Sequence, residues 1–327
     1  MNRGPAAGTV MSTGWGLKTL SPDALEKIHA ATLDVLQSTG VRVDSQEALK
    51  ILAKEGCWVN TKTNVVRFPE HIVKQALDTC PSQILLAGRN ADRDFMMGGR
   101  EVGFTTFGTG VQVEDLETGE IRDSTKADVA QIARLTDALE HMDVLSSPVE
   151  ARDKPGSSHD LHMFEAVLMN CTKHYACEAE NGDRMETMIE MAKVVAGNAE
   201  TLKRRPIFSM SACPTSPLQL IEEAADVIVV SARNWIPINV LSMVMAGATS
   251  PISVSGALVT HNAEVLSGIV LAQATNPGAP VIYGSSSTTF DMRYGTAVVG
   301  VPEMAMISAA AADMANFYGL PSYVAGG

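Results

Sequence analysis

The last quarter of the sequence constrains the fold most tightly, because it predicts two consecutive helix-then-strand units. An apolar helix over residues 255–275 precedes a strand over residues 280–284. A second helix over residues 302–318 precedes a strand over residues 322–325. Both strands are apolar on two faces, which is typical of parallel strands covered by helices. This stretch therefore predicts part of a parallel sheet wrapped in helices.

The same alternation of helix and strand runs back to residue 101. We expect seven strands, over residues 103–108, 144–149, 175–179, 207–212, 238–243, 280–284 and 322–325. Parallel strands joined by helical crossovers form an open sheet or close on an eighth strand into a barrel. Seven strands favour a TIM-type (β/α)8 barrel that is incomplete at its C-terminal end. The open sheet is the alternative, but the first strand lacks the G-x-G-x-x-G pattern of a dinucleotide-binding sheet.

Residues 1–100 predict a different organisation, with short helices and minor strands. Ser21-Pro22 is typical of a helix start, and a second helical pattern runs from Asp44 to Gly56. We therefore expect a helix-rich cap over residues 1–100 and a partial, catalytic barrel over residues 101–327.

Two capping boxes mark helix starts in the predicted barrel. One runs from Thr125 to Asp128 and precedes a helix over residues 129–140. The other runs from Ser216 to Gln219 and predicts a helix over residues 218–233.

Composition excludes several classes of protein. The formal net charge of −12 argues against a nucleic-acid partner. The apolar helices carry polar residues every few positions and the N-terminus lacks a long apolar run, so we expect a cytoplasmic protein with no membrane contact. The five cysteines are scattered without metal-ligand spacing, which favours reduced thiols.

The candidate site residues follow from the rule that barrel sites lie at the carboxyl ends of the strands. Glu150 and Glu178 end two predicted strands, and Phe107 and Tyr283 lie at the ends of two others. Carboxylates there can neutralise a bound ammonium or move a proton, and aromatic rings can pack against a cation. We expect Glu178 to act as the catalytic group, with Phe107, Tyr283 and Glu150 binding substrate. For Glu150, and for Glu180 nearby, the alternative is a solvated loop charge.

Other reactive patterns are weak. His159, His162 and Glu165 share the start of one predicted helix, but no ligand from a strand end joins them, so we expect no metal site. Cys213 follows a strand, although the prolines around it favour a structural turn over a nucleophile.

Several long phrases resemble the trimethylamine:corrinoid methyltransferase family. They are GATSPISVSGALVTHNAEVLSGIVLAQATNPGAPVIYG, DMRYGTAVVGVPE, NFYGLPSYVAGG, LSPDALEKIHAATLDVLQSTGVRV and TTFGTGVQVEDLETGEIRDST. The resemblance spans nearly the whole chain and implies a TIM-type barrel. It implies transfer of a methyl group from a methylated amine to the Co(I) form of a cognate corrinoid protein. We therefore expect no directly bound cofactor, the corrinoid (cobamide) of the partner as methyl acceptor, and a homo-oligomeric enzyme.

In trimethylamine-specific members of this family, pyrrolysine encoded by an amber codon follows the LPSYVAGG segment. The resemblance thus implies that the chain is truncated at that codon and that its natural form continues past Gly327. Two alternatives stay open. One is a methyltransferase for a quaternary amine such as glycine betaine, and the other is a truncated binding module without catalysis.

Overall fold

The described part of the chain forms two compact units. The computed structural model describes residues 18–99 and 101–326. The first unit spans residues 85–210, and the second joins the described residues up to 84 with those from 211 onward. This division differs from the expected boundary at residue 100, because helices near the N-terminus pack on a helix near the C-terminus.

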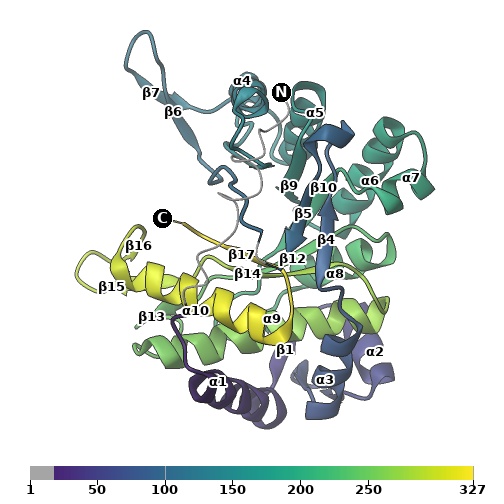
Figure 1. Cartoon of the computed structure of the whole chain (residues 1–327), viewed down its shortest axis with the longest axis vertical. Helices are drawn as coiled ribbons and strands as arrows, with labels where there is room; N and C mark the ends of the chain where they lie inside the picture. The colour runs from purple at the N-terminus through teal and green to yellow at the C-terminus, as the bar shows by residue number, and fades with distance from the viewer. Residues whose placement is uncertain (1–17, 100, 327) are drawn as a thin grey trace. The chain divides into compact units, whose positions relative to one another are not determined.

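The second unit is organised around α9 (Val254–Thr275), as Figure 1 shows. Helices α1 (Pro22–Asp34), α2 (Gln46–Glu55), α3 (Glu70–Thr79), α8 (Glu222–Arg233) and α10 (Pro302–Tyr318) all contact it. By length and composition α9 is apolar enough to cross a membrane, but 78% of its most apolar stretch is buried. It therefore has the burial of a core helix in a globular protein.

Three parallel strands of this unit pack on α9 and α10. They are β12 (Ile238–Ser242), β14 (Val281–Ser285) and β17 (Ser322–Val324). Val240 lies opposite Tyr283 in the β12–β14 pair, and Tyr283 lies opposite Ser322 in the β14–β17 pair. Each strand follows a helix in sequence, so the predicted helix-then-strand units of this region are confirmed.

Short strands form two further sheets in the second unit. One holds β1 (Val41–Val43), β2 (Trp58–Asn60), β3 (Val65–Arg67) and β11 (Gln219–Leu220), and the other β13 (Met245–Ala246), β15 (Thr288–Asp291) and β16 (Thr296–Val298). The second sheet is built from loops that follow the carboxyl ends of β12 and β14.

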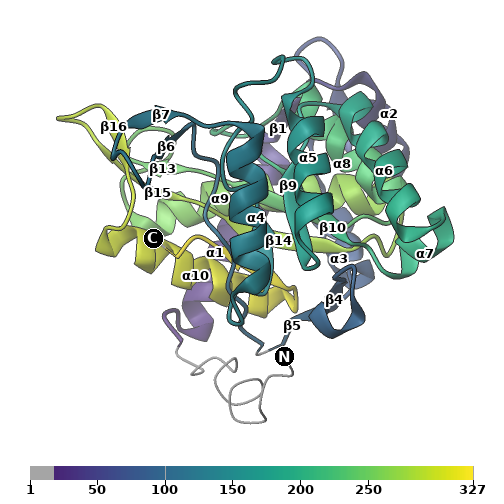
Figure 2. The same cartoon turned by 90° about the horizontal axis from the view of Figure 1, so that it is seen from above.

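In the first unit, helices again alternate with strands along the chain. Its helices, visible in Figure 2, are α4 (Lys126–Ala138), α5 (His159–Asn170), α6 (Gly182–Ala196) and α7 (Ala199–Arg204). The strands are β8 (Val144–Ser146), β9 (His174–Glu178) and β10 (Phe208–Ala212), whose end passes into the second unit. The hairpin β6 (Gln112–Glu114) and β7 (Ile121–Asp123) precedes α4, and β4 (Gln83–Leu86) pairs with β5 (Phe95–Gly98). The predicted strands over residues 144–149, 175–179 and 207–212 form within a few residues of those ranges.

The first predicted strand, over residues 103–108, does not form a regular ladder. Isolated parallel bridges join Thr105 to Val144 and Gly110 to Val149. Between them the Thr106 hydroxyl exchanges hydrogen bonds of 2.9 Å with the backbone of Ser146. A threonine side chain thus replaces backbone pairing. The segment therefore runs alongside β8 without forming a strand.

The predicted start of α8 is wrong. The Ser216–Gln219 pattern predicts a helix from residue 218, but α8 begins at Glu222. The Leu218 amide instead donates to a side chain of α9, and β11 pairs with β1. Tertiary hydrogen bonds therefore override the local capping pattern. The Thr125–Asp128 capping box, in contrast, is confirmed at α4.

Replacing Asp128 by Asn will destabilise the first unit by about 2 kcal/mol at neutral pH. The buried Asp128 carboxylate accepts two hydrogen bonds from Arg122 and caps α4 through Thr125. These contacts, Arg122 foremost, hold the pKa of Asp128 well below its usual range. The stabilisation is therefore complete above the unfolded pKa of about 4 and is lost as pH falls toward the folded pKa.

Urea unfolding between pH 7 and pH 2 measures this difference. Asp183→Asn is the control, because Asp183 is exposed in the first turn of α6 and contributes only a helix-dipole effect. A gap between wild type and Asp128→Asn that stays constant down to pH 2 would contradict the account.

Candidate functional site

Glu178 occupies the carboxyl end of β9 on the face directed away from α5. Successive side chains of a strand alternate between faces. Tyr175 and Cys177 are buried, and the Tyr175 ring lies 5.8 Å from that of Phe164 on α5. Ala176 and Glu178 therefore point to the opposite face, and Glu178 is solvent-accessible there.

Glu150 lies beyond the end of the neighbouring strand β8 and acts electrostatically on Glu178. Its backbone amide donates to the carbonyl of Gly110 at 2.9 Å, which fixes the chain at this point. Desolvation raises the pKa of Glu178, and the negative charge of Glu150 raises it further. Glu178 is thus reachable by solvent yet short of water around its carboxyl group. Neighbouring negative charges of this kind favour a bound cation.

Phe107 lies in the segment that runs alongside β8, and 66% of its surface is exposed. Gly108 beside it approaches the chain so closely that a Cβ would lie 1.7 Å from the Ser147 carbonyl oxygen. Only glycine is accommodated at that position, and the Phe107 ring beside it is largely exposed.

Tyr283 does not have the position expected of a substrate-binding residue. It is fully buried, and its hydroxyl lies 2.8 Å from Asn262 Oδ1 and 3.3 Å from His261 Nδ1, both on α9. Its cross-strand neighbour Val240 also packs on α9, against Gly268. The predicted contact between Tyr283 and substrate is therefore corrected: the side chain packs between strand and helix.

Sequence reasoning missed Asp160, a buried carboxylate at the start of α5. Its oxygens accept from the Leu161 amide at 2.9 Å and the Glu180 amide at 3.4 Å, and Arg184 lies 3.5 Å away. Asp160 thereby holds the turn that follows Glu178. An aspartate in a first helical turn is too common to single out from sequence. Glu180 itself is exposed, and its carboxylate lies 3.6 Å from His159. It therefore matches the alternative of a solvated loop charge.

The residues weighed as metal ligands have other partners. Glu165 pairs with Lys126, and the Lys126 ammonium lies 3.3 Å from His162. Among residues 18–99 and 101–326, no group of three His, Cys, Asp or Glu side chains has the arrangement of a metal site.

None of the five cysteines forms a disulfide. Burial raises the pKa of Cys57 and Cys80 to about 12 and that of Cys171 to about 11. These three stay protonated at neutral pH and are poor nucleophiles. Cys213 is exposed after the end of β10.

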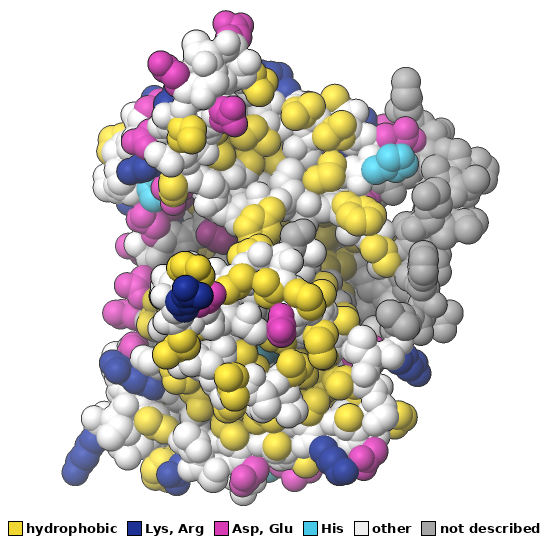
Figure 3. Space-filling model, turned by 90° about the vertical axis from the view of Figure 1, so that its left-hand side faces the viewer, with side chains coloured by type: hydrophobic (Ala, Val, Ile, Leu, Met, Phe, Trp, Pro, Cys, Tyr) yellow, Lys and Arg dark blue, Asp and Glu magenta, His cyan; other side chains and the backbone are white. Residues whose placement is uncertain are grey.

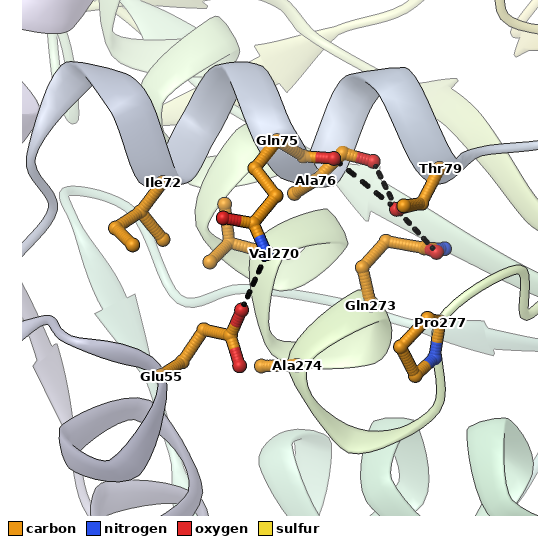
Figure 4. A pocket seen from close by; sticks show the side chains of 9 residues that line it. All are labelled: Glu55, Ile72, Gln75, Ala76, Thr79, Val270, Gln273, Ala274 and Pro277. Atoms are coloured by element: carbon orange, nitrogen blue, oxygen red, sulfur yellow. Dashed lines mark hydrogen bonds between the residues drawn. The ribbon is translucent and has the colours of Figure 1, made fainter.

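A small cavity lies among α2, α3 and the end of α9, as Figure 4 shows. It is lined by Glu55, Ile72, Gln75, Ala76, Thr79, Val270, Gln273, Ala274 and Pro277. Its volume of about 20 Å³ holds little more than one water molecule, so it is too small for an organic ligand.

Exposed apolar side chains gather on the second unit over β15, β16 and α10, as Figure 3 shows. They include Met292, Tyr294, Val299 and Met306, each more than half exposed. Apolar patches of this kind often contact other molecules.

The sequence matches the trimethylamine methyltransferase (MTTB) family over residues 6–327. The chain belongs to this family. The family's match covers both units and includes Glu150 and Glu178.

Individual relatives agree with this assignment. The chain is 47% identical to trimethylamine methyltransferase MttB of Desulfitobacterium hafniense, over 98% of this chain and 65% of the relative. It is 48% identical to MttB of Methanosarcina barkeri, over 98% of this chain and 66% of the relative. Glycine betaine methyltransferase of Desulfitobacterium hafniense is 33% identical over 94% of this chain and 64% of the relative. The chain spans about two thirds of the length of these relatives.

Solved structures of methylamine methyltransferases share the fold. The hydroxylamine complex of MtmB matches with a TM-score of 0.59 and 14% identity, over 95% of this chain and 63% of that one. Monomethylamine methyltransferase MtmB of Methanosarcina barkeri matches with a TM-score of 0.54 and 15% identity, over 94% and 66%. The predicted fold class, an α/β protein of TIM-barrel type, is confirmed.

Proposed function

We propose that the full-length protein transfers a methyl group from trimethylamine to the Co(I) centre of a cognate corrinoid protein. The observation that carries this proposal is the identity of 45–48% to relatives named trimethylamine methyltransferase, against 33% to one named glycine betaine methyltransferase. Trimethylamine at neutral pH is mainly a cation. The paired carboxylates Glu178 and Glu150 are suited to bind such a cation.

Glu178 is the group that we expect to move the proton. A raised pKa brings its proton exchange nearer to neutral pH than that of an ordinary glutamate. Accepting the N–H proton leaves neutral trimethylamine, whose lone pair is free to form a bond. The Glu150 carboxylate would stabilise the positive charge that returns to nitrogen when that bond forms, and protonated Glu178 can give the proton back to the leaving nitrogen. We expect the exposed Phe107 ring to contact the methyl groups of the cation.

In the transfer itself, the Co(I) nucleophile of the partner forms a bond to one methyl carbon. The C–N bond breaks, its electron pair stays on nitrogen, and dimethylamine leaves after taking up a proton. The pyrrolysine implied by the resemblance would supply an electrophilic ring imine that binds the amine nitrogen. We propose that it follows the LPSYVAGG segment in the full-length protein.

The test combines the full-length protein, a corrinoid protein reduced to Co(I) and trimethylamine. We expect methylation of cobalt, followed by its absorbance spectrum, with dimethylamine formed in equal amount. Methylation with glycine betaine but not with trimethylamine would favour the quaternary-amine alternative. Methylation with neither would reject both, and amine binding without transfer would favour the non-catalytic module.

The expected pyrrolysine has a separate test. Sequencing the codon after Gly327 should reveal an amber codon followed by an open reading frame. Mass spectrometry of the native protein should then show a chain longer than 327 residues. Any other stop codon would reject this part of the proposal. We also propose that the protein is a homo-oligomer located in the cytoplasm. Light scattering on the native protein would test the oligomeric state.

A further inference from the structure

Glu264 is a fully buried carboxylate in the middle of the apolar helix α9. Burial raises its pKa, while hydrogen bonds from neutral donors lower it in part. An unpaired buried carboxylate costs several kcal/mol unless hydrogen bonds compensate for the lost water. The hydrogen bonds that Glu264 accepts explain how its carboxylate is tolerated in a packed core.

The three donors to Glu264 lie at the carboxyl end of β12 and in the loop between β10 and β11. The Ser242 hydroxyl, on the last residue of β12, donates to Oε2 at 2.6 Å. The Ser216 hydroxyl donates to the same oxygen at 2.9 Å, and the Leu218 amide donates to Oε1 at 2.9 Å. Ser216 and Leu218 belong to the loop that follows β10. One side chain of α9 therefore joins this loop to the end of β12.

The loop after β10 contains one residue with a strained backbone conformation. Leu218 has a φ of 57°, in the left-handed region that a branched side chain rarely adopts. Such backbone strain persists where the surroundings over-determine it, and it often occurs at functional sites. The hydrogen bond from the Leu218 amide to Glu264 is one such constraint.

The network continues from Ser242 to the loop that follows β14. The Ser242 carbonyl accepts from the Ser286 amide at 3.0 Å and from the Ser287 hydroxyl at 3.2 Å. The Ser287 hydroxyl also accepts from the Val244 amide at 3.2 Å. Ser242 and Ser287 are fully buried. Three loops at strand carboxyl ends, after β10, β12 and β14, are thus tied to one another through Glu264 and Ser242.

We propose that Glu264 is a positioning residue, which fixes these three loops in the arrangement that methyl transfer requires. The inference rests on the proposed function, because it assigns the loops to the reacting end of the barrel. Glu264 does not itself contact substrate, since it lies on α9 behind the strands. Its role is to keep the loops ordered before substrate binds, so that no ordering has to accompany the reaction.

Gln273 provides a matched control on the same helix. It is also buried, and it also makes three hydrogen bonds, to the Ala279 carbonyl, the Gly278 amide and the Thr79 hydroxyl. These partners lie in the turn that enters β14 and in α3, which is the opposite end of the strands. Loss of Gln273 should therefore affect stability without affecting the loops at the carboxyl ends.

The experiment compares Glu264→Gln and Gln273→Leu in the full-length enzyme with its corrinoid protein. We expect Glu264→Gln to lower kcat about tenfold, because small displacements of positioning groups slow a reaction strongly. Amide hydrogen exchange should become faster over residues 213–220 and 243–248. Gln273→Leu should lower Tm and speed exchange over residues 276–280, with kcat unchanged. Ser216→Ala removes one hydrogen-bond donor to Glu264, so it should also speed amide exchange in the loops and lower kcat. It provides the test if Glu264→Gln folds poorly.

Two results would overturn the inference. One is equal loss of kcat in Glu264→Gln and Gln273→Leu, which would reduce Glu264 to a stability role. The other is faster loop exchange in Glu264→Gln with kcat unchanged, which would separate loop order from catalysis. Absence of methyl transfer in the wild type would instead reject the proposed function, while hydrogen exchange would still report whether Glu264 holds the loops.

Discussion

Glu178→Gln in the full-length enzyme will lower kcat/KM for trimethylamine about 100-fold, the size expected for loss of a general acid or base. The variant keeps the shape of the side chain but carries no charge and exchanges no proton. Its free energy of unfolding at neutral pH should equal or exceed that of wild type. Loss of activity without loss of stability is the pattern expected of a functional carboxylate rather than a structural one.

The expected stability follows from the direction of the pKa shift. Desolvation and Glu150 raise the folded pKa of Glu178 above its unfolded value. Protonation therefore favours the folded state, and stability falls as pH rises from the unfolded pKa through the folded one. At higher pH, Glu178→Gln removes this unfavourable charge. Urea unfolding at pH 4 and pH 7 should show the variant gaining on wild type as pH rises.

Amine binding should show the opposite trend with pH. The charged form of Glu178 attracts the ammonium, so wild-type affinity weakens as pH falls through the raised pKa. Glu178→Gln should bind weakly and with little change over the same range. Isothermal titration calorimetry at several pH values measures both.

Glu180→Gln is the control, because Glu180 is exposed two residues away and pairs only loosely with His159. We expect its kcat/KM to stay within about twofold of wild type, as for other exposed charges. Equal losses in the two variants, or a wild-type rate in Glu178→Gln, would remove Glu178 from the mechanism.

The sequence predicts strand positions well where short apolar runs end in polar or breaking residues. β12 and β14 were expected over residues 238–243 and 280–284, and both form within a residue or two of those ranges. Their burial on both faces depends only on local composition. Residues 103–108 have a similar pattern, yet the Thr106 side chain replaces the backbone ladder there. No local pattern distinguishes these two outcomes.

The facing of side chains is harder to predict than the strands themselves. Glu178 and Tyr283 were both chosen because they lie near strand ends. The Glu178 side chain lies on the same face of its strand as that of the partly exposed Ala176. The Tyr283 side chain lies on the same face of the sheet as that of its cross-strand neighbour Val240, which packs on α9. A shift of one residue exchanges the two faces of a strand, so strand-end position alone cannot separate these cases.

The role of Glu264 depends on contacts that are distant in sequence. A single carboxylate within the apolar stretch of α9 is the only local signal. Its partner Leu218 is 46 residues away, and that contact displaces the predicted start of α8. Capping rules describe a local competition for hydrogen bonds, and here a tertiary acceptor prevails.

Gly284→Ala will destabilise the second unit by about 3 kcal/mol, near the upper end of the range for overpacked cores. A Cβ on Gly284 would lie 2.1 Å from Asn239 Oδ1, 2.8 Å from the Val240 carbonyl oxygen and 2.9 Å from Leu241 Cα. The Asn239 side chain can rotate away. The other two atoms belong to the backbone of β12, which is hydrogen-bonded to β14 along its length. Relief therefore requires separation of the two strands.

Gly156→Ala is the matched control, because a Cβ there meets no atom within 4 Å. We expect its free energy of unfolding to stay within about 0.5 kcal/mol of wild type. Urea unfolding followed by circular dichroism measures both variants. Separating β12 from β14 also loosens the Ser286 amide from the Ser242 carbonyl, so Gly284→Ala should speed amide exchange at residues 285–288. A variant as stable as wild type would show that the two strands do not approach as closely as the structure indicates.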